Sequence, residues 1–143
     1  FTMTLIRDCT PADLPEVVAI ERQSFNHPYP LVVFTRYLRA TFLVAELGQH
    51  LAGYIIGVKM GDKTLIVSLA VHPLYRRRGV GTSLVQRLME RLPSSVTEIQ
   101  VRPSNAAALG FYPTLGFERK QVIPRYYANG EDAVVMVRRR GPE

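Results

Sequence analysis

The chain has 143 residues, of which 47% are hydrophobic and 21% charged, close to the averages for globular proteins. A chain of this length can bury a core without disulfides, so we expect a single domain over residues 1–143 rather than a disordered or fibrous protein. The 18 basic and 12 acidic side chains give a net charge of +6, and only three of the basic residues are lysines. This arginine bias fits either a solvated surface or an anionic partner such as a phosphorylated ligand, RNA or a ribosomal surface.

Membrane, secreted and metal-binding proteins are all disfavoured. No apolar run approaches the roughly 18 residues that span a membrane, and the N-terminus lacks a charged segment followed by an apolar one. Cys9 is the single cysteine and cannot form an internal disulfide, which fits a cytoplasmic protein. Without clustered histidines beside it, we expect no metal site.

The first third of the chain reads as a strand followed by two helices. We expect a strand over 5–7 and a helix that begins at Thr10, with Pro11 at its first helical position. Apolar residues then recur at helical spacing as far as Phe25. The two prolines in 27–30 must end that helix, and a second short helix follows over 32–40.

The middle of the chain predicts three strands and a long helix. Strand-like segments at 42–47, 51–59 and 64–71 are separated by turns that contain glycine. The third is largely apolar, as in a strand buried on both faces. A strongly amphipathic helix follows over 80–92 and is ended by a proline.

The last third predicts a strand over 98–101, a helix from Asn105 to about 115, and strands over 117–122 and 133–139. The order β-α-α-β-β-β-α-β-α-β-β mixes hairpins with a strand–helix–strand unit, which predicts an α+β fold with helices on the sheet faces. Pro113 falls inside the last helix, where proline costs about 3 kcal/mol. We therefore expect a kink or an early end beside Tyr112.

The segment Arg76-Arg77-Arg78-Gly79-Val80-Gly81-Thr82 follows a strand and opens the amphipathic helix. Its glycines let the backbone approach a ligand, and the free amides of the first helical turn favour an anion. The spacing matches neither a P-loop nor the dinucleotide motif GxGxxG. From these residues alone, the segment is either a pyrophosphate site or a basic, solvated turn.

The run VSLAVHPLYRRRGVGTSL resembles the acetyl-CoA segment of the GNAT superfamily of N-acetyltransferases, whose motif Gln/Arg-x-x-Gly-x-Gly/Ala reads Arg76, Gly79 and Gly81 here. A second family element reads Asn105, Ala108, Tyr112, Gly116 and Phe117. A third string, YYANGEDA at 126–133 followed by Met136, resembles the protein N-terminal acetyltransferases, including the bacterial ribosomal-protein alanine enzymes and the archaeal ones. The resemblance covers nearly the whole chain.

The resemblance implies a mixed, splayed sheet flanked by helices, with acetyl-CoA as cosubstrate and no metal. It implies cofactor contacts at the end of a strand, in the following loop and on the last helix: Leu69, Ala70, Val71, Arg76, Arg77, Arg78, Gly79, Val80, Gly81, Thr82, Asn105 and Tyr112. In the family, the tyrosine that aligns with Tyr112 is the general acid that protonates the leaving thiolate.

Gln100 departs from the ribosomal-protein enzymes, where a glutamate at this catalytic position acts as general base. A glutamine cannot take a proton. About a tenth of an α-amine is neutral at pH 7, against about 0.04% of a lysine, so a base matters far less for N-termini. The base lies elsewhere, or water carries the proton, or the enzyme is weak or inactive. Other candidates are Glu21, His27 and His72, although Glu21 also reads as a helix-surface charge and the histidines as solvated loop residues.

The family's substrate loops fall on 25–30 and 124–131, where His27, Tyr29, Tyr126 and Tyr127 are the expected substrate contacts. These features predict a cytoplasmic enzyme that acetylates the α-amine of a protein N-terminus, such as that of a ribosomal protein. The alternatives are acetylation of a small amine or polyamine and a non-catalytic CoA-binding module. RNA binding is not expected beyond incidental ribosome contact, because the chain lacks the motifs of known RNA modules.

Overall fold

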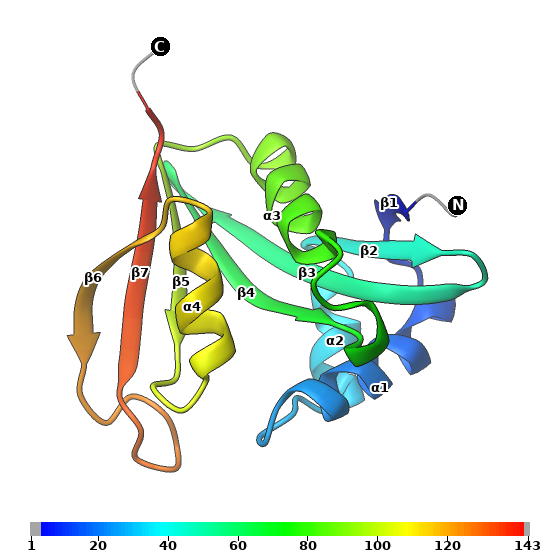
Figure 1. Cartoon of the computed structure of the whole chain (residues 1–143), viewed down its shortest axis with the longest axis horizontal. Helices are drawn as coiled ribbons and strands as arrows, with labels where there is room; N and C mark the ends of the chain where they lie inside the picture. The colour runs from blue at the N-terminus through cyan, green and yellow to red at the C-terminus, as the bar shows by residue number, and fades with distance from the viewer. Residues whose placement is uncertain (1–3, 142–143) are drawn as a thin grey trace. The chain divides into compact units, whose positions relative to one another are not determined.

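The strands form one mixed sheet with helices beside it (Figure 1). The computed structural model describes residues 4–141, which hold seven strands and four α-helices. The strands are β1 (Thr4–Asp8), β2 (Thr41–Leu47), β3 (His50–Met60), β4 (Lys63–Val71), β5 (Val96–Val101), β6 (Glu118–Ile123) and β7 (Ala133–Arg139). The α-helices are α1 (Leu14–Ser24), α2 (Leu31–Tyr37), α3 (Val80–Arg91) and α4 (Ala106–Thr114), and 3-10 turns lie at Pro11–Asp13 and Pro73–Tyr75.

The order of strands in the sheet is β1-β2-β3-β4-β5-β7-β6. β4 and β5 are parallel, with α3 in the connection between them, whereas β1–β2, β2–β3, β5–β7 and β6–β7 are antiparallel pairs. The predicted α+β class, the mixed sheet and the order of helices and strands are therefore confirmed. Among the described residues, no helix has the length and apolar character needed to cross a membrane.

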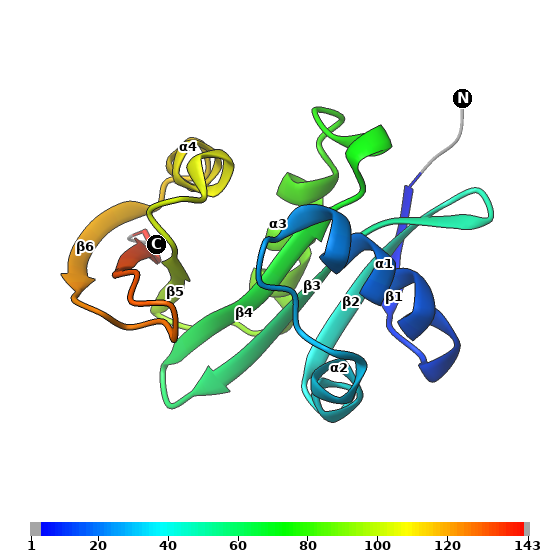
Figure 2. The same cartoon turned by 90° about the horizontal axis from the view of Figure 1, so that it is seen from below.

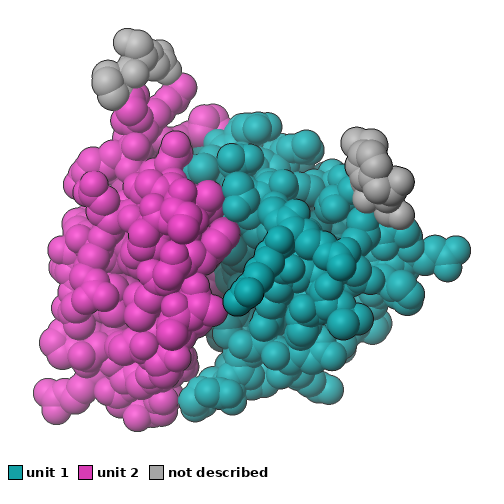
Figure 3. Space-filling view, viewed as in Figure 1, with its two compact units in different colours: residues 1–58, 68–92 teal, residues 59–67, 93–143 magenta. Residues whose placement is uncertain are grey.

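The chain divides into two compact units (Figure 3). Unit 1 comprises residues 1–58 and 68–92, and unit 2 comprises residues 59–67 and 93–143. The boundaries fall within β3, within β4 and after α3, so each unit is assembled from two separate stretches of sequence. The single domain expected over residues 1–143 stays a prediction.

In unit 1, α3 packs directly on β3 because two glycines leave room for it. A Cβ added to Gly57 would lie 2.7 Å from a methyl carbon of Leu88, and one added to Gly53 would lie 2.7 Å from the Ala70 carbonyl oxygen. Real Cβ atoms do not approach so closely, so any side chain here would push the helix or the strand away. Glycine within a strand often marks such a close approach.

The opposite face of β3 carries an aromatic cluster beneath α1 and α2. The Phe34 ring of α2 meets the Tyr54 ring edge-on at 5.6 Å between centroids, and Phe42 of β2 lies 6.0 Å from Tyr54. All three side chains are buried. Figure 2 shows α1 and α2 on the near side of β2 and β3. Both faces of β3 are thus covered by helices.

Burial along β4 alternates, so the expectation of a strand buried on both faces is wrong. Thr64, Ile66, Ser68 and Ala70 are buried, while the residues between them are half-exposed. Alternation follows from the two-residue period of a strand. The buried face of β4 includes the hydroxyl side chains Thr64 and Ser68, whereas the half-exposed face is mostly apolar. Because apolar residues lie on both faces, the sequence suggested that both were buried.

Unit 2 contains the first part of β4 together with β5, β7, β6 and α4. The parallel pairing with β4 joins Lys63–Ile66 to Val96–Ile99, and β7 pairs with β5 on its other side. β6 pairs with β7 and its side chains are exposed apart from a half-buried Ile123.

The expected break beside Tyr112 is wrong. Tyr112 and Pro113 both lie within α4, which continues to Thr114. The Leu115 and Phe117 N–H groups then bond to the Tyr112 carbonyl, at 3.0 and 3.2 Å. Because Pro113 is the second-to-last helical residue, its missing N–H affects only the final turn. The Tyr112 ring packs edge-on against Phe117 at 5.2 Å, which helps to hold that turn in place.

Candidate active site

The loop before α3 forms a main-chain nest. Arg77 and Gly79 have positive φ angles of 64° and 79°, and Gly79 is the N-cap of α3. The first helical bond runs from the Ser83 N–H to the Gly79 carbonyl, so the amides of Val80, Gly81 and Thr82 have no partner within the helix. A Cβ at Gly79 would meet nothing within 4 Å. This open, dipole-favoured set of amides fits the pyrophosphate of a CoA-type molecule.

Arg76, the first residue of the motif, points back into its own unit. Its Nε donates to the Val71 carbonyl at 3.0 Å, and its Nη2 donates to the Ser24 hydroxyl at 3.3 Å. Arg76 therefore fixes the loop against the ends of β4 and α1. The amides of the nest, flanked by the exposed Arg77 and Arg78, are left as the groups that face an anion.

The end of β4 is held by main-chain bonds. Ala70 is buried, whereas Leu69 and Val71 are half-exposed. The His72 N–H donates to the Ala52 carbonyl at 2.7 Å. The His72 ring, expected to be a solvated loop group, is half-exposed, and its Nδ1 accepts the Leu74 N–H at 3.1 Å. That bond makes His72 the cap of the 3-10 turn that leads to the nest.

Glu21 is not the helix-surface charge that the sequence suggested. Its side chain is only 2% exposed and lies on the inner face of α1. It accepts a hydrogen bond from the Tyr29 N–H at 2.9 Å and a short one from the Tyr54 hydroxyl. Tyr54 also bonds to the Ser68 hydroxyl of β4 at 3.0 Å. Burial raises the pKa of the Glu21 carboxyl, and the hydrogen bonds that it accepts act in the opposite direction.

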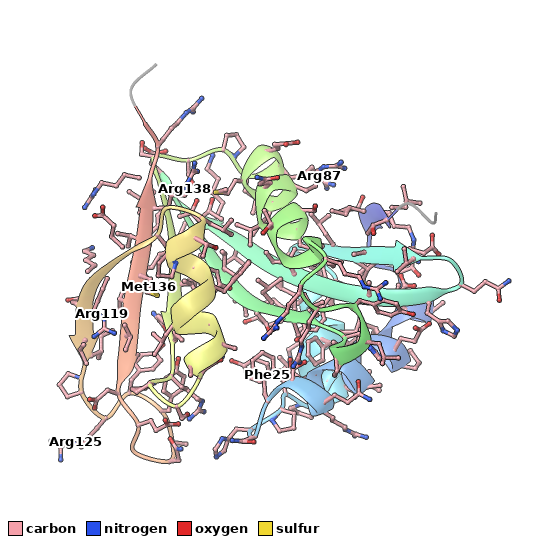
Figure 4. All side chains as sticks on the ribbon, viewed as in Figure 1. Phe25, Arg87, Arg119, Arg125, Met136 and Arg138 are labelled. Carbon is pink, nitrogen blue, oxygen red and sulfur yellow. The ribbon has the colours of Figure 1, made fainter. Side chains whose placement is uncertain are left out.

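The loop between α1 and α2 carries two of the predicted substrate contacts. It begins at Phe25, labelled in Figure 4. His27 is exposed, as predicted for a loop histidine, and Tyr29 is 43% exposed with its ring edge against Phe34. The loop thus presents an aromatic ring and an imidazole while its backbone is fixed by Glu21.

In unit 2, α4 places Asn105 and Tyr112. The Asn105 side-chain oxygen caps the helix by accepting the Ala108 N–H at 3.1 Å, as predicted. Tyr112 is buried, and this burial raises the pKa of its phenol above the ordinary value. The phenol therefore stays protonated at neutral pH and can donate a hydrogen bond or a proton.

Gln100 is half-buried on β5, in register with Val135 of β7. Glu98 and Gln100 are two positions apart in β5, so they share one face of the strand. Glu98 is paired with Lys63 at 3.5 Å. The Glu98 carboxylate is therefore engaged in an ion pair, and Gln100, on the same face of β5, is uncharged.

Arg102 is a site residue that the sequence reasoning missed. Its guanidinium lies 3.9 Å from the centre of the Tyr127 ring and donates to the Asn129 and Glu131 side chains at 2.9 and 3.0 Å. Hydrogen bonds from Ser104, Asn129 and Arg102 lower the pKa of Glu131 to about 2. Arg102 directly follows the end of β5 at Val101, and nothing in the neighbouring sequence indicates its contact with the distant Tyr127.

The loop between β6 and β7 closes on itself around Glu131. The N–H groups of Tyr126 and Tyr127 both donate to the Glu131 carbonyl, at 2.9 and 3.0 Å. Asp132 accepts the Arg125 N–H at 3.0 Å, which adds a second hydrogen bond across the loop. Figure 4 shows Arg125 extending outward at the end of β6. The ring of Tyr126 is 48% exposed, and that of Tyr127 is half-buried under Arg102.

The predicted substrate contacts come from both units. His27 and Tyr29 belong to unit 1, and Tyr126 and Tyr127 belong to unit 2. The predicted cofactor contacts of β4 and the nest lie in unit 1, with Asn105 and Tyr112 in unit 2. Among residues 4–141, no three His, Cys, Asp or Glu side chains gather in a way that could hold a metal ion.

Comparison with known proteins finds relatives along almost the whole chain. The acetyltransferase (GNAT) family model matches residues 6–117. An N-alpha-acetyltransferase of Sulfurisphaera tokodaii is 33% identical over 92% of this chain and 90% of its own length. The ribosomal protein bS18-alanine N-acetyltransferase of Escherichia coli K12 is 30% identical over 94% of this chain and 96% of its own.

The fold is shared with solved structures. Ard1 from Thermoplasma volcanium superposes with a TM-score of 0.89 at 27% identity, covering 97% of this chain and 99% of that one. The nest before α3, Asn105 and Tyr112 all lie within residues 6–117, which the family model matches. The chain therefore belongs to the acetyltransferase (GNAT) family, whose members transfer acetyl groups from acetyl-CoA.

Proposed function

We propose that this acetyltransferase acts on the α-amine of protein or peptide N-termini. The observation that carries the proposal is the loop between β6 and β7, in which Arg102 and Glu131 hold Tyr126 and Tyr127 in one conformation. A fixed pair of tyrosines can wall a narrow slot for an extended peptide. The two relatives described above, which are named for acetylation of α-amines, support the same substrate class.

The donor side of the reaction rests on main-chain groups. The amides of Val80, Gly81 and Thr82 bind the pyrophosphate of acetyl-CoA. Main-chain groups of Leu69–Val71 bind the pantetheine arm, and an amide there stabilises the oxyanion that forms when the amine attacks the thioester carbonyl. Such donors stabilise a transition state best when they are fixed in advance. Arg76 and the His72 amide supply that rigidity.

Tyr112 assists departure of the thiolate. A free thiol has a pKa of about 8.5 and a free phenol of about 10, so complete proton transfer from a tyrosine to a free thiolate is uphill by at least about 2 kcal/mol. Burial of Tyr112 raises the pKa of its phenol and makes the transfer still less favourable. The phenol therefore acts mainly by hydrogen-bonding the sulfur as negative charge develops in the transition state. The proton released by the amine can finally neutralise the thiolate.

The acceptor amine needs little help to lose its proton. Its pKa is about 7.7–8.0, so roughly a tenth is neutral at pH 7, and the neutral form binds and attacks directly. Gln100 can then be tolerated where the ribosomal-protein enzymes carry a glutamate. The same arithmetic disfavours lysine side chains as substrates, because their neutral fraction is more than a hundredfold smaller.

The site of acetylation is tested with one peptide that carries a free α-amine and an internal lysine. The peptide is incubated with the enzyme and acetyl-CoA, and fragmentation mass spectrometry locates the acetyl group. The proposal requires the acetyl group on the N-terminal residue. Acetylation of the lysine alone, or of a polyamine in preference to the peptide, would overturn it. A ribosomal-protein N-terminal sequence is the first peptide to use, because the E. coli relative is named for such a substrate.

A further inference from the structure

Glu21 holds both ends of the loop that leaves α1. Its backbone carbonyl accepts the Phe25 N–H at 3.1 Å, and its side-chain Oε2 accepts the Tyr29 N–H at 2.9 Å. The intervening residues are therefore closed into a loop between two oxygens of one residue. His27, a predicted substrate contact, lies inside that loop, and Tyr29 is at its end.

The same carboxylate is tied to the sheet. Its other oxygen accepts the Tyr54 hydroxyl of β3, and Tyr54 bonds in turn to Ser68 of β4. Phe34 packs edge-on against the Tyr54 ring on one side and against the Tyr29 ring on the other. The backbone of Tyr29 is thus located relative to β3 and β4 through one buried side chain.

Packing alone does not explain a carboxylate in this place. Glu21 lies beside Val17, Val18 and Ile20 on the buried face of α1, where an apolar residue would complete the core. Burying a carboxyl group is unfavourable unless its oxygens are satisfied, and here the partners are the loop amide and the Tyr54 hydroxyl. Burial of the Glu21 carboxyl group therefore costs folding free energy, and one of the contacts that offset this cost is to the loop backbone at Tyr29.

We infer that Glu21 is a positioning residue for the acceptor substrate, because its carboxylate sets the conformation of the loop that carries His27 and Tyr29. This inference rests on the proposed function, since it assigns that loop to the acceptor side. Glu21 does not touch the reacting atoms. Loss of its side-chain contact frees the Tyr29 backbone while leaving the nest at Gly79–Thr82 unchanged.

Glu16 provides a matched control on the same helix. It is also a glutamate of α1, and its Oε2 also accepts a backbone N–H, that of Leu51, at 2.9 Å. Leu51 belongs to β3 and lies outside the predicted substrate loops. Substituting Glu16 therefore removes the same kind of contact from the same helix without releasing the loop.

The experiment measures the KM for a free-amine peptide and the KM for acetyl-CoA in the wild-type enzyme and in Glu21→Ala, Glu21→Gln and Glu16→Ala. Glu21→Ala is expected to raise the peptide KM about tenfold or more, as when one positioning bond is lost, with the acetyl-CoA KM within about twofold of wild type. Glu21→Gln keeps an oxygen for the Tyr29 N–H and a donor for the Tyr54 oxygen, so it should restore most of the peptide affinity. Glu16→Ala should leave both KM values unchanged.

Hydrogen exchange of the Tyr29 amide gives a readout that does not depend on activity. The amide should be protected in the wild type and in Glu16→Ala, and should exchange faster in Glu21→Ala. Should that variant fail to fold, Glu21→Asp is measured instead, because its shorter carboxylate keeps the charge but cannot reach the Tyr29 N–H. An unchanged peptide KM, or equal rises in both KM values, would overturn the inference. A wild-type enzyme that acetylates no peptide would instead refute the proposed function, while the exchange measurement would still test the Glu21–Tyr29 link.

Discussion

Arg102 at the carboxyl end of β5 stacks on the ring of Tyr127, with 3.9 Å between the guanidinium carbon and the ring centroid. The same guanidinium pairs with Glu131, whose carbonyl accepts the Tyr127 N–H. The side chain that directly follows β5 therefore contacts both the Tyr127 ring and the residue that holds the backbone of the loop between β6 and β7. This arrangement links the strand that carries Gln100 to the loop that we assign to the substrate.

Replacement of Arg102 should loosen that loop and weaken acceptor binding. Arg102→Ala is expected to raise the peptide KM about tenfold, because both the stacking and the ion pair are lost. Arg102→Lys should fall between alanine and wild type, since lysine keeps the charge but not the planar stacking. Arg119→Ala on the exposed strand β6 is the control. Equal peptide KM values in all three variants would show that Arg102 does not shape the substrate loop.

Removal of the Tyr112 hydroxyl should slow the chemical step. Tyr112→Phe keeps the ring that packs against Phe111 and Phe117, so the fold should be retained. Loss of a proton or hydrogen-bond donor to the leaving group is expected to lower kcat about 10²- to 10⁴-fold with little change in the acetyl-CoA KM. Steady-state kinetics measure kcat and the acetyl-CoA KM of Tyr112→Phe. The control is Tyr37→Phe, which removes a hydroxyl group from α2. A kcat for Tyr112→Phe close to that of Tyr37→Phe would exclude the assigned role.

Gln100→Glu should restore a base and change the pH dependence. In the wild type, kcat/KM should rise with pH as the α-amine loses its proton and should level off above about pH 8. A carboxylate at this position could raise the rate at pH 7 by at most about tenfold, because roughly a tenth of the amine is already neutral there. No gain is expected at pH 9.

Gln121→Glu is the matched control for that substitution. Gln121 also faces Val135 in register, but from the exposed strand β6. The substitution Gln121→Glu adds the same charge on the other side of β7 and should leave the pH dependence of kcat/KM unchanged. A Gln100→Glu profile parallel to that of wild type would mean that proton removal from the amine is not helped from this position.

Substitution of two glycines by alanine should change the free energy of unfolding in opposite directions. Gly57→Ala places a methyl group 2.7 Å from the Leu88 side chain beneath α3 and should destabilise the protein by about 1–3 kcal/mol. Gly110→Ala lies in α4 with nothing within 4 Å of the new carbon and should stabilise it by about 0.5–1 kcal/mol. Denaturant unfolding of both variants measures the difference. Equal effects of the two substitutions would contradict the packing of α3 on β3 described above.

Local signals in the sequence were sufficient for most of the fold. β7 spans Ala133–Arg139 as predicted, and the prolines around His27 separate α1 from α2. Asn105 caps α4 with its own side chain, which the sequence pattern had indicated. These features depend on residues close together in the chain, so caps, turns and periodicity were enough to find them.

The predictions that failed depend on long-range packing. The charge of Glu21 suggests an exposed side chain, although its spacing from Leu14 and Val17 places it on the apolar face of α1. Only the fold brings Tyr54 to its carboxylate. Arg102 gave no local sign of its stack on Tyr127, which lies far along the chain. Pro113 is accommodated because its turn is packed by Phe117, which a propensity argument does not include. The site is therefore less predictable than its scaffold, since its residues are positioned by contacts between distant segments.

Acetylation of N-terminal α-amines is the activity that we propose for this enzyme. The most direct measurement is CoA release from acetyl-CoA with short peptides that differ in their first residue, each tested with a free and with an acetyl-blocked N-terminus, and with a polyamine in parallel. The account predicts turnover of free-amine peptides alone, with a preference among first residues. Equal turnover of blocked and free peptides, or turnover of the polyamine alone, would contradict it.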